Sequence, residues 1–441
     1  LAEKTAFGMV KKYLEERGES AGNAELDRLT LGCVGVRRTT GQHPGGLVVV
    51  PDDMDVEDFT AVQHPADDPD SDTVTTHFEY HCMEDNLLKL DMLGHDDPTM
   101  IRMLEDLTGV NARAIPLDDP DTMSIFTSSK VLGFENDEIL GPTGAVAIPE
   151  FNTRFTRGML MDTMPKDFNT LVRLSGFSHG TDVWLGNARD LIVGGTASVL
   201  ETVGCRDDIM LYLISMGLDP KMSFKIMEAV RKGKVKKGGF QEGWEEAMRE
   251  HQVPDWYIGS LAKIGYLFPK AHAVAYVMMA FRIAWFKVHE PLAFYATFFS
   301  IRAKAFDAEY CCAGMDAVKQ KIREIENNKD ATDVEQNLLV TLEVCYEFYL
   351  RGFHFDTISI YDSDATHFKV TENGLLPPFV TVRGLGETAA LDTVEKRQGK
   401  TFVSVEEFAT TCNKLSKTHI EQLKALGAFA GMADTSQVAL F

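Results

Sequence analysis

One carboxylate within an apolar strand pattern is the residue of this chain best suited to bind a metal ion. Asp91 lies in the segment 86–94, where leucine and methionine surround it. Burial disfavours a charged carboxylate unless a cation or hydrogen bonds compensate for the lost water. We therefore expect Asp91 to be neutralised by a partner in the core or to hold a metal ion, and carboxylate oxygens are ligands that Mg²⁺ prefers.

A glycine-rich turn precedes the other short apolar strand pattern. Residues 41–51 read Gly-Gln-His-Pro-Gly-Gly followed by Leu and three valines. Glycine allows close backbone approach, and cationic or polar side chains complement phosphate. The candidates for contact with a triphosphate or a template backbone are Arg37, Arg38, Gln42 and His43. Such a turn taken alone is weak evidence for a phosphate-binding site, because a tight turn with exposed charges has the same pattern.

The segment 178–187 reads Ser-His-Gly-Thr-Asp-Val-Trp-Leu-Gly-Asn. A catalytic triad of Ser178, His179 and Asp182 is excluded, because adjacent residues rarely reach triad geometry and no nucleophile-elbow motif surrounds the serine. A second segment places Lys270, His272 and Tyr276 on an alanine-rich helix.

On that helix, Tyr276 follows His272 by four residues, so the two share a face. Tyrosine can stack on a base, and lysine or histidine can contact phosphate. A buried helix with a satisfied histidine explains His272 equally well.

Four segments together resemble the C-family bacterial replicative DNA polymerases, the DNA polymerase III alpha subunits, most closely those of PolC type. They are residues 37–46, 86–98, 178–187 and 269–276. The resemblance runs from about residue 1 to the end. It implies nucleotidyl transfer from dNTPs to a primer 3′ hydroxyl on primer-template DNA, with two Mg²⁺ ions.

In the resembled family the palm presents three aspartates, and Asp91 matches the last of them. The two earlier aspartates would precede Leu1, so we expect this chain to be the C-terminal part of a longer polypeptide and inactive alone. The resemblance also places Ser178, His179, Thr181 and Asp182 in the fingers, at the pocket for the nascent base pair.

A formal net charge of −22 disfavours DNA binding by the chain as a whole. Positive charge is nevertheless concentrated in one segment, which includes Arg231, Lys232, Lys234, Lys236 and Lys237. A charged run is more often a solvated surface than a binding site. Against this acidic background, we expect the group to contact the DNA backbone.

Two C-terminal features indicate further partners. The segment 382–390 resembles the hairpin of a helix-hairpin-helix element, in which amides near Gly384 and Gly386 can bind a DNA phosphate. Gln437, Leu440 and Phe441 at the end resemble the peptide by which replicative polymerases dock on the sliding clamp. A frayed terminus is the alternative interpretation of that tail. Other replisome subunits are further expected partners.

The composition predicts a cytoplasmic protein with no membrane partner. Seven cysteines without a Cys-x-x-Cys pair do not indicate a disulfide framework or a zinc site. No secretion signal opens the chain. The most apolar long segment, 271–286, contains His272 and Arg282, so we expect no membrane span.

The periodicity of apolar residues predicts an α+β protein. The resemblance implies that it holds a small mixed β palm remainder, a large mostly α fingers region and a helix-hairpin-helix module. We expect helix caps at Asp97, Asp119 and Ser223. The expected domains are a helical lead-in at 1–30, the second part of the palm at 31–100, fingers at 101–305, a connecting helical and strand module at 306–375, the helix-hairpin-helix module at 376–432 and the clamp-binding tail at 433–441.

Two other functions compete with the polymerase. One is a non-catalytic scaffold that binds DNA and the sliding clamp. The other is a metal hydrolase built on His77, His81, Asp85 and Asp91, which is disfavoured because its histidines lack helical spacing.

Overall fold

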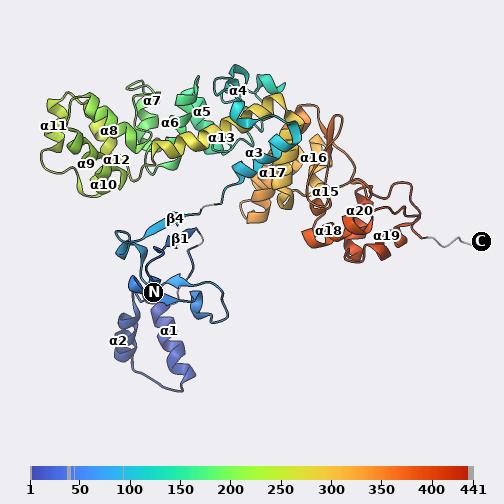
Figure 1. The fold of residues 1–441 in the computed structure, drawn as a ribbon, viewed down its shortest axis with the longest axis horizontal. Helices are drawn as coiled ribbons and strands as arrows, with labels where there is room; N and C mark the ends of the chain where they lie inside the picture. Colours follow the sequence, from blue (N-terminus) through green and yellow to red (C-terminus); the bar gives the residue numbers. More distant parts are fainter. Residues whose placement is uncertain (1, 37–40, 44, 93, 436–441) are drawn as a thin grey trace, which may run out of the picture. The chain divides into compact units, whose positions relative to one another are not determined.

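The chain forms two compact units, 1–95 and 96–441. The computed structural model describes residues 2–36, 41–43, 45–92 and 94–435 (Figure 1). Arg37, Arg38, Gln437, Leu440 and Phe441 therefore lie outside the described residues. Helices dominate and the few sheets are small, so the α+β class expected from the sequence is confirmed.

The first unit combines a helical pair with two antiparallel strand pairs. Its elements are α1 (Glu3–Glu16), α2 (Asn23–Cys33), β1 (Gly46–Val49), β2 (Val62–Gln63), β3 (Thr75–Thr76) and β4 (Leu88–Asp91). Strand β1 pairs with β4, and β2 pairs with β3. Helix α1 buries Ala6, Val10 and Leu14, one residue per turn, against α2.

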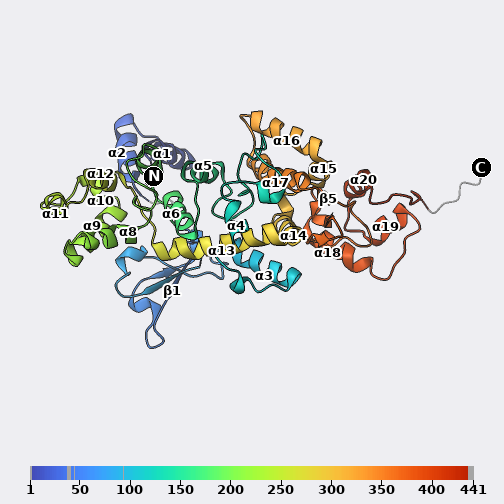
Figure 2. The same cartoon turned by 90° about the horizontal axis from the view of Figure 1, so that it is seen from above.

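The second unit begins with a helical region built around one long helix, α13 (Lys270–His289), which contacts α3, α4, α6, α8 and α14 (Figures 1 and 2). The other helices are α3 (Asp96–Thr108), α4 (Pro120–Ser124), α5 (Arg154–Thr163), α6 (Phe168–His179), α7 (Arg189–Val193), α8 (Arg206–Ser215), α9 (Pro220–Arg231), α10 (Lys234–Gly238), α11 (Trp244–Glu250), α12 (Asp255–Lys263) and α14 (Pro291–Ile301). Buried alanines and phenylalanines of α13, among them Ala280 and Phe281, let these helices pack closely around it.

The remainder of this unit holds a helical pair, α16 and α17, a mixed three-stranded sheet and four shorter helices. They are α15 (Ala308–Cys311), α16 (Met315–Asn327), α17 (Asp333–Leu350), β5 (His354–Phe355), β6 (Lys369–Val370), β7 (Gly374–Leu376), α18 (Glu387–Lys396), α19 (Val405–Thr411) and α20 (Lys417–Ala425). Strand β7 lies in the middle, parallel to β5 and antiparallel to β6. The rings of Phe299, Phe306, Phe348, Phe355 and Phe368 pack against one another in tilted and edge-to-face pairs.

The predicted helix caps are partly confirmed. Asp119 caps α4, because its carboxylate accepts a hydrogen bond from the Thr122 amide at 2.9 Å. The prediction for Ser223 is wrong: α9 begins a turn earlier, and Asp219 caps it. Proline at the first helical position supplies the fixed φ that favours this earlier start. Asp97 lies within α3, which begins at Asp96, and not before it.

Helix α13 is, among the described residues, the one helix long and apolar enough to cross a membrane by length and composition. The expectation that its charges exclude it by that criterion is therefore wrong. Core helices pass the same test, and eight residues of α13 are buried against the protein, including Lys287. The Lys287 ammonium contacts Glu347 at 2.7 Å, and both side chains are fully buried. These contacts are those of a core helix.

Candidate functional site

The first unit brings the glycine-rich turn next to Asp91. In the antiparallel pair of β1 and β4, Gly46 lies directly opposite Asp91. The next amide, of Met92, donates to the Gly45 carbonyl at 2.5 Å. The His43 ring accepts from the Gly45 amide at 3.2 Å, which folds the turn back on the strand. A side chain at position 46 would meet that ring, because an added Cβ would lie 3.1 Å from Nδ1.

Asp91 itself is exposed, and this corrects the expectation that it is a desolvated carboxylate in a core. Its side chain is 59% exposed and lies 3.3 Å from the ammonium of Lys89. Leu88, Leu90 and Met92 are exposed as well. A two-stranded ribbon cannot bury both of its faces, so the apolar pattern around Asp91 does not produce a core.

An exposed carboxylate beside a turn fits Mg²⁺ as one hard oxygen ligand. Within the described residues, no group of three or more His, Cys, Asp and Glu side chains could hold a metal ion. The hydrolase alternative also lacks support, because His77 is hydrogen-bonded to Gln63 at 2.6 Å. The side chain of His81 lies outside the described part of the structure. If Asp91 holds a metal ion, it would be a single ligand, since the described residues contain no such group of ligands around it.

The second unit brings the two predicted fingers segments together at the end of α6 and the start of α13 (Figure 2). The ring of His179 lies 5.8 Å from that of His272 and 5.4 Å from that of Phe268. His272 lies 4.3 Å from Tyr276, so the two do share a helical face, as predicted. The result is a half-exposed aromatic surface, which we call the aromatic cluster: Tyr266, Phe268, His179, His272 and Tyr276.

Glu150 belongs to this site, and sequence reasoning missed it. Its carboxylate lies 2.5 Å from Nε2 of His179 and accepts a hydrogen bond from the Ser175 hydroxyl at 3.1 Å. The hydrogen bond to Glu150 raises the pKa of His179 above its usual value, while burial opposes the shift. No local pattern links a glutamate to a histidine 29 residues later.

Thr181 and Asp182 attach the chain after α6 to the turn before α13. The Thr181 amide donates to the Tyr266 carbonyl at 2.9 Å. Asp182 has a left-handed backbone, with φ of +56°, and its carboxylate contacts the Lys236 ammonium at 2.6 Å. A Cβ at Gly265 would lie 2.7 Å from the Asp182 carboxylate, which would have to shift to make room for it. Ser178 donates its hydroxyl to the Ser175 carbonyl at 2.9 Å, so Ser178, His179 and Asp182 have separate partners and do not form a triad.

Lys270 begins α13, and its amide donates to the carboxylate of Asp207 at 2.7 Å. Its ammonium is 3.8 Å from Asp208, with the side chain 39% exposed. Asp208 in turn contacts Arg173 at 2.5 Å. The acidic pair at the start of α8 therefore fixes the N-terminus of α13, and with it the position of His272.

The basic segment forms the end of α9 and the short helix α10. Arg231 and Lys232 pair with Glu228, and Lys236 pairs with Asp182. Lys234 and Lys237 are exposed and make no ion pair with another described residue. A cationic surface thus lies directly beside Asp182 of the fingers segment.

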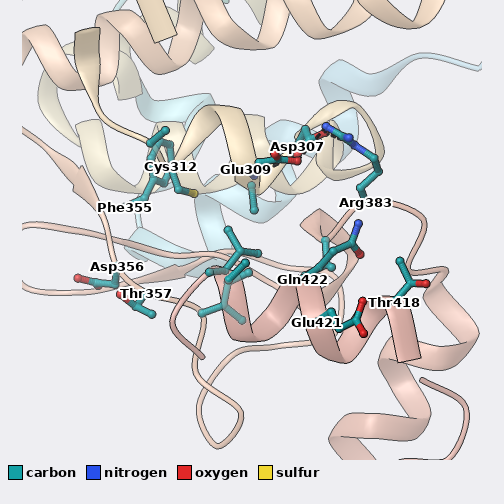
Figure 3. Close-up of a pocket in the computed structure, with 16 residues that line it drawn as sticks. Asp307, Glu309, Cys312, Phe355, Asp356, Thr357, Arg383, Thr418, Glu421 and Gln422 are labelled. Carbon is teal, nitrogen blue, oxygen red and sulfur yellow. Dashed lines mark hydrogen bonds and ion pairs between the residues drawn. The ribbon is translucent and has the colours of Figure 1, made fainter. Parts of the chain in front are cut away.

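The predicted hairpin at 382–386 leads into α18. Gly384 has φ of +77°, which glycine adopts without strain, whereas Gly386 has φ of −76°. The neighbouring Arg383 contacts Asp307 at 2.7 Å and Glu309 at 3.1 Å across a cleft of about 570 Å³ (Figure 3). Glu421 and Gln422 of α20 line the other side of this cleft. Arg383 is held by two carboxylates, so a phosphate at the hairpin would be bound by backbone amides.

Comparisons with known proteins agree with this division of the chain. Residues 3–94 match the model of the bacterial DNA polymerase III alpha NTPase domain, and residues 97–252 match that of the bacterial DNA polymerase III alpha subunit finger domain. Residues 352–438 match a helix-hairpin-helix motif. The whole chain is 55% identical to a DNA polymerase III PolC-type of Caldanaerobacter subterraneus subsp. tengcongensis, and covers 31% of that protein. The chain belongs to the PolC-type bacterial DNA polymerase III family.

Other PolC-type relatives are similar at the same level. The identity is 51% to the proteins of Halalkalibacterium halodurans and Streptococcus pyogenes, again over 100% of this chain and 30% of each relative. The chain thus spans about a third of the length of the curated PolC-type relatives it matches. The boundary between the two matched polymerase domains, after residue 94, coincides with the boundary between the two compact units.

Proposed function

We propose that this chain is part of a replicative DNA polymerase that extends a primer on a DNA template with deoxynucleoside triphosphates. The observation that supports the proposal is the register of β1 and β4, in which Gly46, at the end of the turn that contains Gln42 and His43, pairs with Asp91. A hard oxygen ligand and phosphate-binding groups are thereby adjacent, as nucleotidyl transfer requires. Family membership supports the same reaction.

In the proposed reaction, Asp91 contributes one ligand to Mg²⁺, and the remaining ligands would come from elsewhere in the complete polymerase. Bound Mg²⁺ activates the primer hydroxyl and stabilises the charge of the leaving pyrophosphate. His43 and Gln42 would contact phosphate. Lys89 must release Asp91 for this role, which costs little because exposed ion pairs contribute about 0–1 kcal/mol.

In the second unit, we assign the aromatic cluster to the incoming nucleotide. Tyr276 and His272 provide flat surfaces for a base, and His179 and Lys270 provide hydrogen-bond donors for its phosphates. Thr181 and Asp182 shape the edge of this surface. The DNA backbone would be contacted by Lys234 and Lys237. It would also be contacted by Lys236, Lys232 and Arg231, once each has exchanged its carboxylate partner for a phosphate. The hairpin with Gly384 and Gly386 would add a phosphate contact farther along the DNA.

Two proposed partners and the proposed location rest on the sequence alone. Gln437, Leu440 and Phe441 would bind the sliding clamp, and other replisome subunits would join the complete enzyme in the cytoplasm.

The reaction is tested in the complete polymerase with Asp91→Ala. Primer extension should fall by about 10³-fold or more, because charge stabilisation in the transition state is lost, while primer-template binding persists. Asp85→Ala is the matched control, an exposed aspartate of the same unit that should extend normally. Extension at the normal rate by the Asp91 variant would show that the carboxylate is not a catalytic ligand. Binding without extension by the unaltered protein would instead favour the scaffold.

A further inference from the structure

Glu150 lies on a buried loop whose backbone is fixed from several directions. Residues 143–148 are all buried, and Ala147 and Glu150 both have left-handed backbones, with φ of +63° and +68°. Residues other than glycine rarely adopt this conformation, and where they do the surroundings must hold it. The loop therefore stores strain at the two positions that lead to the Glu150 carboxylate.

Three contacts hold the loop in place. The ammonium of Lys287 donates to the carbonyls of Gly144, at 2.8 Å, and Val146, at 2.5 Å. Asn152 accepts a hydrogen bond from the Ala147 amide at 2.6 Å. Lys287 itself is fixed by Glu347. A rigid core thus determines where Glu150 points.

The contact between Glu150 and His179 determines which ring nitrogen of the imidazole carries the proton. Nε2 lies against the carboxylate, so it keeps its hydrogen in both charge states. A neutral His179 therefore presents the lone pair of Nδ1, which repels phosphate oxygens. A protonated His179 presents an N–H at Nδ1, which attracts them.

We propose that Glu150 is a positioning residue, which holds His179 so that its Nδ1 edge donates to a phosphate of the incoming nucleotide. This inference rests on the proposed function and extends it. The Glu150 carboxylate contacts both Nε2 of His179 and the hydroxyl of Ser175, which fixes it against α6. The side chain is 8% exposed, whereas His179 is 34% exposed and can be reached by a ligand.

Three described side chains lie against His179: Glu150 from the loop, His272 from α13 and Phe268 from the turn before α13. Tyr276 and Tyr266 lie behind them, against His272 and Phe268. Asp182, farther along the chain, is already paired with Lys236. Glu150 supplies both the hydrogen bond and the charge that raise the pKa of His179. Its removal should therefore lower that pKa.

The test uses Glu150→Gln, because glutamine can still accept from Nε2 but carries no charge. In the chain itself, NMR titration of histidine labelled at Cε1, assigned with His179→Gln, should show a lower pKa for His179 in Glu150→Gln. Glu343→Gln is the matched control, since Glu343 is an equally buried carboxylate that pairs with Arg157 and Arg154. It should leave the titration of His179 unchanged.

In the complete polymerase, the KM for dNTP should rise with pH as His179 loses its proton, and Glu150→Gln should move this rise to lower pH. At neutral pH we expect a KM about tenfold higher with a similar kcat, as for the loss of one charge-assisted hydrogen bond. At acidic pH the variant should match the unaltered enzyme. Glu150→Ala should lose affinity at all pH values.

The outcomes separate this inference from the proposed function. An unchanged His179 titration in Glu150→Gln overturns the inference. A lowered pKa without any shift in the pH profile of KM also overturns it, while normal primer extension leaves the polymerase function intact. Failure of the unaltered complete protein to extend a primer would overturn both.

Discussion

Lys287 and Glu347 show how a single buried pair can support the site. Burial lowers the pKa of Lys287 to about 8, even though Glu347 favours the charged form. Lys287→Met would leave the Glu347 carboxylate buried without its cation. That carboxylate would keep only the hydrogen bond that it accepts from the Tyr295 hydroxyl at 2.6 Å. We expect a loss of about 3–5 kcal/mol in the free energy of unfolding, measured by urea denaturation.

Lys319→Met is the control for that measurement, because Lys319 pairs with Glu138 on the surface at 2.5 Å. An exposed pair should contribute no more than about 1 kcal/mol. Similar losses for the two lysine variants would mean that the buried pair does not anchor the loop before Glu150.

Individual residues also show what sequence could and could not reveal. His272 and Tyr276 were predicted to share a face because Tyr276 follows His272 by one helical turn, whereas His179 was placed in the fingers by the family resemblance, and nothing local showed that its ring lies 5.8 Å from that of His272. Glu150 was not predicted, because its contact with His179 depends on tertiary packing. The predicted burial of Asp91 was wrong for the same reason. An apolar pattern shows which residues can be buried, but whether they are buried depends on how many strands the sheet has.

At the scale of elements, the hairpin before α18 gives a prediction with an internal control. Gly384→Ala forces an alanine into a left-handed conformation, which costs about 1–2 kcal/mol, and should displace the amides that would bind phosphate. Gly386 has an ordinary φ of −76°, and the Cβ of an alanine there would have open space around it. Gly386→Ala should therefore leave the stability of the protein nearly unchanged. Thermal unfolding and the salt dependence of DNA binding measure the two effects.

Only the Gly384 variant should lose affinity for DNA, with a log–log salt slope smaller by about 1 for the lost phosphate contact. Equal binding by both variants at every salt concentration would place the DNA away from this hairpin.

The elements themselves were largely predictable, whereas their pairing was not. The spacing of apolar residues predicts helices within 1–30 and over 336–350, and the structure has them at 3–16, 23–33 and 333–350. The last begins earlier than predicted because Thr332 and Glu335 form a capping box. The two strands at 46–49 and 88–91 were also expected from their composition. Nothing local specified that they pair with Gly46 opposite Asp91, because register depends on residues about 40 apart in the chain that meet only in the fold.

At the scale of the whole molecule, the two compact units differ sharply in the size of their cores. The large connected core runs from Met100 to Phe429, entirely within the second unit. The described part of the first unit has five buried apolar side chains, which are Ala6, Val10, Leu14, Met83 and Leu87. Small cores contribute little stability, so the first unit should depend on the rest of the polymerase.

This difference predicts opposite behaviour for two fragments. Residues 96–441 expressed alone should unfold cooperatively at nearly the melting temperature of the full chain's main transition, because no buried apolar residue of that core is removed. Residues 1–95 should show weak protection from hydrogen exchange and no sharp thermal transition. Circular dichroism and amide exchange measure both. A stable, cooperative 1–95 fragment would mean that its ribbon and helical pair form a sufficient core, and that Asp91 is held rigidly without the remainder of the enzyme.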